Sequence, residues 1–260
     1  MTRWLRIVGA GIAFFSVTLV LLPPHLLALR FDWPLARRIP RLWHGLMSPV
    51  LGLKVSTRGE LDPRRPLMLI ANHVSWLDII ALGAVADVVF IAKAEVRNWP
   101  VFGMLARWQR SVFVDREVRR STGRQVAAVT ERLERGEIVV LFAEGTTSDG
   151  NRVLDFKSSL FGVVRQAGED ADNHVVLQPV SIAYTRIQGM PMGRRHRPLA
   201  AWPGDVELRP HLLTVLREGA IDVEIGFGAP REITDARSRK SVSRELRDEV
   251  AAMLARALRG

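Results

Sequence analysis

A histidine and an aspartate, His73 and Asp78, stand five residues apart directly after an apolar run of the sequence. Histidine titrates near neutral pH. An imidazole held by a carboxylate at one ring nitrogen can therefore act as a base through the other. An aspartate about one helical turn along the chain can reach back to the ring in this way. Helix-capping pairs and local hydrogen bonds use the same spacing, so the two residues alone leave both interpretations open.

The residues around this pair predict a buried strand followed by a helix. Leu67–Ala71 is uniformly apolar, as is typical of a strand buried on both faces. The run breaks at Asn72, and either Asn72 or Ser75 can cap a new helix, because short polar side chains accept its first free N–H groups. Open α/β sheets bind ligands beyond the carboxyl ends of their strands, which is where we expect His73.

Four short motifs follow one another in the chain. They are Asn72-His73-x4-Asp78; Lys93-Ala94-Glu95 with Pro100, Gly103 and Phe113-Val114-Asp115-Arg116; Phe142-Ala143-Glu144-Gly145-Thr146-Thr147-Ser148; and Leu177-Gln178-Pro179-Val180-Ser181-Ile182. Together they resemble the motifs of the glycerolipid acyltransferases, the family of the 1-acyl-glycerol-3-phosphate (lysophosphatidate) acyltransferases. The resemblance runs from about Gly59 to Phe227. Four motifs in the family's order are more specific than any one of them.

The resemblance implies that a fatty acyl chain moves from a thioester, acyl-CoA or acyl-carrier protein, to a lipid hydroxyl. His73 then serves as the base for the hydroxyl proton, while Asp78 holds the imidazole in one tautomer and stabilises the cation that forms. The family implies no covalent acyl-enzyme, no metal and no cofactor besides the thioester co-substrate. A non-catalytic lipid-binding protein on this scaffold is an alternative, against which the intact pair argues.

The acceptor lipid in this family carries a phosphate, and the resemblance implies five residues for its binding site. They are Arg116, Glu144, Gly145, Thr146 and Lys157. An arginine can bind phosphate through two parallel N–H bonds. Glu144 is expected to orient Arg116 or a backbone amide, because like charges repel. The alternative interpretation of Arg116 and Lys157 is that they are ordinary residues on the exposed surface.

The third motif departs from the family's usual Phe-Pro-Glu-Gly-Thr-Arg-Ser. Ala143 replaces the proline, Thr147 replaces the arginine, and Ser158-Ser159 stands where Lys-Gly usually follows Lys157. All of these changes lie on the acceptor side. The leading expectation is acylation of 1-acyl-glycerol-3-phosphate to phosphatidic acid, for phospholipid synthesis. The alternative is another lysolipid, in particular lyso-ornithine lipid, whose head group has a carboxylate and an amine in place of the phosphate.

The composition is that of a basic protein with a high apolar content. The 260 residues include 37 Lys and Arg against 27 Asp and Glu, a formal charge of +10. This excess predicts an acidic partner, here an anionic membrane surface. Zinc-ligand spacing, repeats and interleaved basic and aromatic residues are all missing, so we expect no nucleic acid partner. The lack of cysteine excludes disulfides, a thiolate nucleophile and Cys-based metal sites.

Residues 1–57 are expected to form a helical membrane-associated segment. Trp4–Leu29 is the most apolar stretch, and its uncharged core, Val8–Leu22, is short for a full span. A cleaved signal peptide and a buried core helix are the alternatives. The basic cluster Arg37–Arg41 favours a catalytic domain on the cytoplasmic side of the cell inner membrane. Leu42–Val55 is expected to be a second helix, packed on the membrane or dipping into it.

Residues 58–260 are expected to form one α/β acyltransferase domain with a largely parallel mixed sheet covered by helices, because strand and helix patterns alternate. The predicted strands are Leu67–Ala71, Val88–Ala92, Val112–Asp115, Ile138–Phe142, Val175–Ile182 and Ile221–Phe227. The predicted helices are Val126–Leu133 with Gly136 as its stop, Ser158–Ala167, and an amphipathic helix over Val242–Leu254.

Two further regions are candidates for contact with the lipid substrates, and each has a purely structural alternative. Met190–Pro210 is rich in arginine, proline and glycine. It is interpreted either as a solvated loop or as a basic flap over the site or against anionic headgroups. Leu105, Trp108 and Pro179-Val180 are candidates for the wall of an acyl-chain tunnel, with ordinary core packing as the alternative.

Overall fold

The structure is a computed structural model that describes residues 2–114, 122–162, 175–204, 206–232 and 238–260. Its strands are β1 (Leu53–Arg58), β2 (Leu67–Ala71), β3 (Val88–Lys93), β4 (Val112–Val114), β5 (Ile138–Phe142), β6 (Val176–Ile187), β7 (Met190–Pro191), β8 (Ile221–Phe227) and β9 (Arg231–Glu232). Its α-helices are α1 (Thr2–Arg30), α2 (Leu35–Leu51), α3 (Leu77–Val85), α4 (Phe102–Trp108), α5 (Thr122–Glu134), α7 (Leu208–Glu218) and α8 (Arg239–Ala257). Two short 3-10 helices are η1 (Ala94–Asn98) and η3 (Arg197–Leu199).

A single sheet forms the centre of the fold, in the order β1-β8-β6-β2-β5-β3-β4, with β7 and β9 paired to β6. Neighbouring strands along this order are parallel except β8 and β6, and β7 and β9 also run antiparallel to β6. The predicted α/β fold with a largely parallel mixed sheet is confirmed. β2, β5 and β8 have the predicted bounds, whereas β6 continues to Ile187 rather than ending at Ile182.

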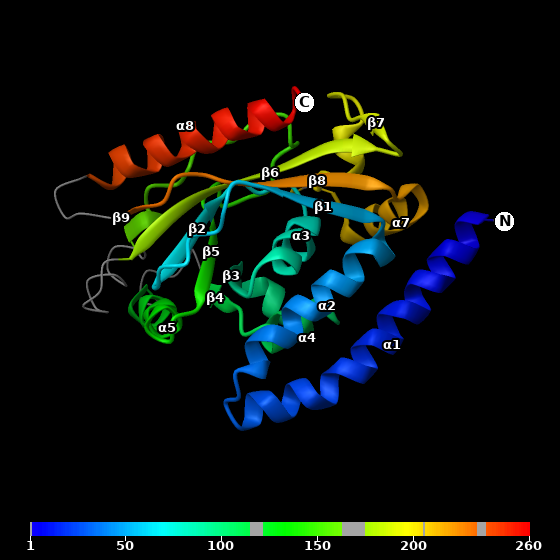
Figure 1. Cartoon of the computed structure of the whole chain (residues 1–260), viewed down its shortest axis with the longest axis horizontal. Coiled ribbons are helices and arrows are strands. Elements are labelled where there is room, and N and C mark those ends of the chain that lie inside the picture. The colour runs from blue at the N-terminus through cyan, green and yellow to red at the C-terminus, as the bar shows by residue number, and fades with distance from the viewer. Residues whose placement is uncertain (1, 115–121, 163–174, 205, 233–237) are drawn as a thin grey trace.

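Helices cover both faces of the sheet (Figure 1). Alternate residues of each strand point to opposite faces, so each strand contributes side chains to both layers of helices. On one face, Leu69 of β2 belongs to a buried cluster that includes Leu82 of α3. On the other face, Met68 of β2 belongs to a cluster with Val129 of α5 and Leu246 of α8. Because β2 is buried on both sides, its apolar run is unbroken.

The long apolar helix α1 packs along α2 and α7 at the outside of the fold (Figure 1). Trp4–Arg30 is long and apolar enough to cross a membrane. Its side chains are largely exposed, with Phe15 and Leu19 at 72% and 73%. Trp43 of α2 ties the two helices together through a 3.0 Å hydrogen bond from Nε1 to Oγ1 of Thr18. The expected N-terminal apolar helix is therefore present, and its exposed hydrocarbon surface can anchor the protein to a membrane.

The predicted helix Leu42–Val55 is wrong at its carboxyl end. α2 stops at Leu51, because Gly52 adopts the left-handed conformation (φ 78°) in which its N–H bonds back into the last turn. The next residues form β1, which pairs in parallel with β8. The division expected between residues 57 and 58 falls inside β1, so the N-terminal helices lead directly into the sheet.

Two of the three predicted helices are confirmed, as α5 and α8. Gly136 follows the end of α5 with a φ of 67° and donates its N–H to Leu133 O (2.8 Å), as a helix stop does. Of the predicted helix Ser158–Ala167, residues 160–162 are helical, and its remainder lies outside the described residues.

Candidate active site

Asp78 lies in the first turn of α3, and its carboxylate binds the free N–H groups of the loop that follows β2. Oδ2 accepts hydrogen bonds from the backbone N–H groups of Val74 (2.7 Å) and Ser75 (3.0 Å). The same oxygen lies 2.7 Å from Nδ1 of His73. The Asp78 side chain is fully buried, so these bonds replace the water that a carboxylate otherwise needs.

Asn72 attaches the same loop to the neighbouring strand β6. Its Nδ2 donates to Ile182 O (3.0 Å) and its Oδ1 accepts from Ile182 N (2.8 Å). The prediction that Asn72 or Ser75 caps the helix is wrong, because α3 begins after Trp76 without a side-chain cap bond. Asp78 binds N–H groups of the loop before the helix, and Asn72 holds the same loop at the sheet edge.

Tyr184 of β6, which lies outside the four motifs, also binds Asp78. Its hydroxyl donates a 2.7 Å hydrogen bond to Oδ1 of Asp78. Burial raises the pKa of the Tyr184 phenol well above its usual range, so the hydroxyl keeps the proton that it donates. The one available sequence signal is that Tyr184 lies two residues beyond Ile182, on the same face of the strand.

The imidazole of His73 is held on two sides. Nδ1 donates to Asp78, and the ring stacks on Phe142 of β5 with 4.0 Å between centroids and 15° between planes. Phe142 stacks in turn on Phe90 of β3. The His73 side chain is 20% exposed, and no described residue hydrogen-bonds to Nε2. An imidazole fixed in this way presents the lone pair of Nε2 to an incoming proton donor.

Glu144 follows β5 and lies against the loop that carries His73. Its Oε1 accepts the backbone N–H of His73 (3.3 Å), while Oε2 is buried without a hydrogen-bond partner. Burial raises the pKa of Glu144 to about 8, so the side chain is mostly protonated at pH 7. Gly145 permits the tight turn at this point, with a φ of 73° and its N–H on Phe142 O (3.1 Å).

The five predicted acceptor residues are brought together only in part. Glu144, Gly145 and Thr146 follow β5, and Thr146 is exposed. Ser148 N–H donates to His73 O (2.8 Å), which joins the third motif to the first. Lys157 has an exposed side chain, and its backbone N–H binds Ala143 O (2.9 Å). Arg116 lies outside the described residues.

The basic segment Met190–Pro210 packs against the same loop. The backbone N–H of Trp202 donates to Val74 O (2.8 Å), directly after His73. Arg197 in η3 is 8% exposed, and its Nη1 donates to Oδ1 of Asn151, on the loop that follows the third motif. Part of the segment is therefore held against the site rather than solvated.

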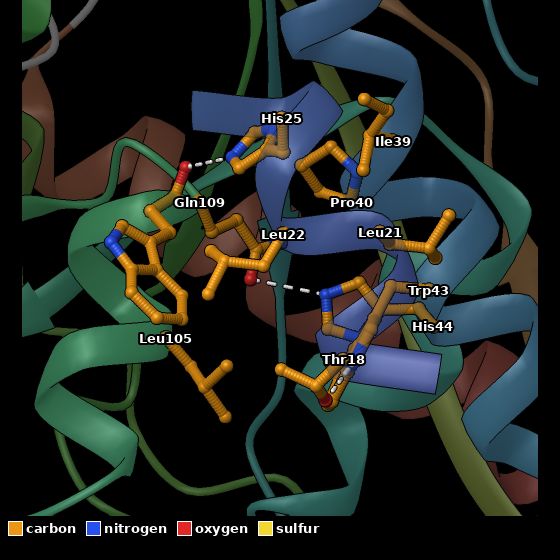
Figure 2. Close-up of a pocket in the computed structure, with 11 residues that line it drawn as sticks. Thr18, Leu21, Leu22, His25, Ile39, Pro40, Trp43, His44, Leu105 and Gln109 are labelled. Atoms are coloured by element: carbon orange, nitrogen blue, oxygen red, sulfur yellow. Dashed lines mark hydrogen bonds between the residues drawn. The ribbon is translucent and has the colours of Figure 1, made fainter. Parts of the chain in front are cut away.

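An apolar pocket lies between α1, α2 and α4 (Figure 2). Two candidates for the tunnel wall, Leu105 and Trp108, line it, whereas Pro179 and Val180 belong to β6 and do not. The remaining lining residues are Thr18, Leu21, Leu22, His25, Ile39, Pro40, Trp43, His44 and Gln109. His25 and His44 bridge the helices through 2.9 Å and 3.0 Å bonds from Nε2 to Trp108 O and to Gln109 Oε1.

The geometry thus holds a partly exposed imidazole whose Nε2 can accept a proton. Among the described residues, no group of three or more His, Cys, Asp or Glu side chains could hold a metal ion. The family model described as Acyltransferase matches residues 52–183, which contain the first and third motifs and all of β2, β5 and α3. The chain belongs to the acyltransferase family.

This acyltransferase is similar to other acyltransferases over its full length. A protein of Rhizobium meliloti (strain 1021) named Lyso-ornithine lipid O-acyltransferase is 54% identical over 100% of this chain and 89% of its own. A protein of the same name from Brucella abortus (strain 2308) is 49% identical over 100% of this chain and 98% of its own. The acyltransferase PlsC of Thermotoga maritima shares the fold, with a TM-score of 0.67, 22% identity and coverage of 98% and 97%.

The expectation that 1-acyl-glycerol-3-phosphate is the acceptor is wrong. A relative named 1-acyl-sn-glycerol-3-phosphate acyltransferase, from Neisseria meningitidis serogroup B, is 32% identical over 84% of this chain. The two relatives named for lyso-ornithine lipid are considerably more similar. The family and the action on a lysolipid remain as predicted, and the choice of acceptor changes.

Proposed function

We propose that the enzyme is an O-acyltransferase for lyso-ornithine lipid. The observation that carries this proposal is the 54% identity, over the whole chain, to a protein of that name. The altered third motif supports it. Thr147, Ser158 and Ser159 replace the basic and small residues usual in the family, so this side of the site has less positive charge for a phosphate.

The proposed chemistry is a direct attack of the acceptor hydroxyl on a thioester, from acyl-CoA or acyl-carrier protein. Nε2 of His73 removes the hydroxyl proton as the oxygen bonds to the thioester carbonyl carbon. Asp78 stabilises the imidazolium that forms and keeps the proton of Nδ1 in place. The tetrahedral intermediate then collapses, the C–S bond breaks, and the leaving thiolate takes the proton from Nε2. No metal or further cofactor takes part.

The acceptor head group is proposed to bind at the turn after β5. Glu144, Gly145 and Thr146 form this turn, with Arg116 and Lys157 as further ligands. Because its pKa is raised, the Glu144 side chain does not repel a negatively charged group of the acceptor as an ionised carboxylate would. A neutral carboxyl can lie beside the acceptor's own carboxylate and donate a hydrogen bond to it.

The enzyme is proposed to work at the cytoplasmic face of the cell inner membrane, where its lipid acceptor resides. The exposed apolar side chains of α1 would enter the hydrocarbon, and the basic cluster at Arg37–Arg41 would contact anionic headgroups. The apolar pocket lined by Leu105 and Trp108 is the proposed site for part of an acyl chain.

The deciding experiment is acyl transfer by the purified full-length protein in mixed micelles. Lyso-ornithine lipid and lysophosphatidic acid, matched in acyl chain, compete for one acyl thioester donor. The proposal expects a higher kcat/KM for lyso-ornithine lipid, and a preference for lysophosphatidic acid would contradict it. A His73→Ala sample serves as the blank for transfer that occurs without the enzyme.

A further inference from the structure

Arg197 is a buried arginine whose hydrogen-bonding groups are only partly used. Its side chain lies in η3, is 8% exposed, and donates from Nη1 to Oδ1 of Asn151. Nε is buried and has no hydrogen-bond partner. Within the described part of the chain, no carboxylate oxygen lies within 4.0 Å of this guanidinium, although the charge of Asp149 interacts with it over a longer distance. A buried guanidinium with an unused N–H group is costly, so a ligand that accepts a hydrogen bond from Nε would be stabilised.

Arg197 lies close to the loop that carries His73 and Val74, called the catalytic loop below. A Cβ on Gly150 would lie 2.9 Å from Cγ1 of Val74 and 3.8 Å from Cδ of Arg197. The three residues are therefore in close contact, and Val74 directly follows His73. The third motif lacks its usual arginine, at Thr147. Arg197 supplies a cation beside the same loop from a distant part of the sequence.

A negative charge lies close to Arg197 on the same surface. Asn151 donates from its backbone N–H to Oδ1 of Asp149 (2.9 Å) and from Nδ2 to Oδ2 (3.1 Å). Its Oδ1 accepts from Arg197. The side-chain amide of Asn151 therefore bridges Asp149 and Arg197 and holds a carboxylate and a guanidinium on opposite sides of one amide group.

We propose that Arg197 and Asp149 bind the zwitterionic head group of the acceptor, Arg197 through its free Nε edge to the α-carboxylate and Asp149 to the terminal ammonium. An ornithine head group carries these two charges at the ends of a four-carbon chain, which matches a site with one cation and one anion. A guanidinium binds a carboxylate through paired N–H bonds. A phosphate acceptor satisfies Arg197 and is repelled by Asp149. This inference rests on the proposed function and deepens it.

The test compares Arg197→Gln with wild type on lyso-ornithine lipid and on its analogue with a carboxamide in place of the carboxylate. Wild type is expected to prefer the carboxylate by about tenfold or more in kcat/KM, the size of a charge-assisted hydrogen bond. Arg197→Gln is expected to raise the acceptor KM, leave the donor KM unchanged and abolish the preference. Arg197→Lys is expected to retain part of the preference for the carboxylate over the carboxamide. Arg195→Ala, on the exposed part of the segment, is the matched control and keeps the preference.

Asp149→Asn gives an independent measurement. Removing its charge is expected to raise the KM for lyso-ornithine lipid severalfold and to lower the KM for lysophosphatidic acid, since repulsion of the phosphate disappears. A merely structural role of the Asp149–Asn151–Arg197 group would change both acceptors in the same direction.

The outcomes separate this inference from the proposed function. A wild-type enzyme that prefers lysophosphatidic acid contradicts both. If wild type prefers lyso-ornithine lipid while Arg197→Gln retains its discrimination between carboxylate and carboxamide, only the inference fails. An equal wild-type rate on carboxylate and carboxamide also overturns the inference, and this arm needs no variant, so a variant that does not fold leaves the test intact.

Discussion

The hydroxyl of Tyr184 donates a 2.7 Å hydrogen bond to Oδ1 of Asp78, the oxygen of that carboxylate that does not face His73. Three bonds converge on Oδ2, so Tyr184 occupies the other end of a buried carboxylate. The bond fixes the carboxylate plane and draws negative charge away from Oδ2. Tyr184 is therefore a positioning residue for His73, which acts through Asp78.

Replacing Tyr184 with phenylalanine keeps the ring and removes this one hydrogen bond. The Asp78 carboxylate then loses a bond that fixes its plane, so we expect kcat to fall while the KM of donor and acceptor stays nearly unchanged. Stability is expected to fall by about 1–3 kcal/mol, because Oδ1 is left buried without a partner. Ser181→Ala, another buried hydroxyl on β6, is the control and is expected to leave kcat in place. An equal rise in the KM of both substrates would indicate a structural role alone.

Replacing His73 with alanine removes the proposed base. Transfer is expected to fall by about 10²–10⁴-fold, the usual contribution of a positioned base, with the protein still folded. Added imidazole is expected to restore part of the rate, because the vacated space lies over Phe142 and opens to solvent. His196→Ala, an exposed histidine, is the control. Near-normal activity of the His73 variant would remove the base assignment.

Glu144 is expected to make stability depend on pH. Its pKa rises from 4.5 to about 8 in the folded protein, so the folded state binds the proton more tightly than the unfolded state does. The free energy of unfolding is then highest at low pH. It falls as pH rises from about 4.5 towards about 8, with a limiting slope of about 1.4 kcal/mol per pH unit. Glu144→Gln does not titrate, so denaturant unfolding from pH 5 to 8 should show wild type losing stability relative to it. The exposed Glu134→Gln is the control, and a constant difference between wild type and Glu144→Gln would contradict the buried, protonated state.

Leu105→Trp is expected to fill part of the pocket between α1, α2 and α4. Long acyl chains would lose buried contact at about 0.8 kcal/mol per methylene, so the preferred chain should become shorter. The measurement is kcat/KM over a series of donors of increasing chain length. Leu46→Trp, on an exposed part of α2 outside the pocket, is the matched control. Unchanged chain preference in the Leu105 variant would place the acyl chain elsewhere.

Several parts of the fold follow from local patterns. The runs Leu67–Ala71 and Ile138–Phe142 are apolar without interruption because both faces of these strands are covered, and their bounds were predicted correctly. The sequence did not predict β1, because most of its residues are exposed and it contains few apolar residues. It forms a strand by pairing with β8, which lies far away in the sequence.

Local patterns were sufficient to predict the family, most strands of the sheet and the proximity of His73 to Asp78, whose five-residue spacing after a buried strand is a local constraint. The groups that surround this pair are brought to it only by the packing of the folded chain. Tyr184 lies 106 residues from Asp78, and Arg197 lies 46 residues from Asn151. No periodic pattern links residues so far apart, since the packing of β6 against β2 and of the basic segment against the catalytic loop brings them together. The neutral state of Glu144 likewise depends on burial, which only the folded chain provides.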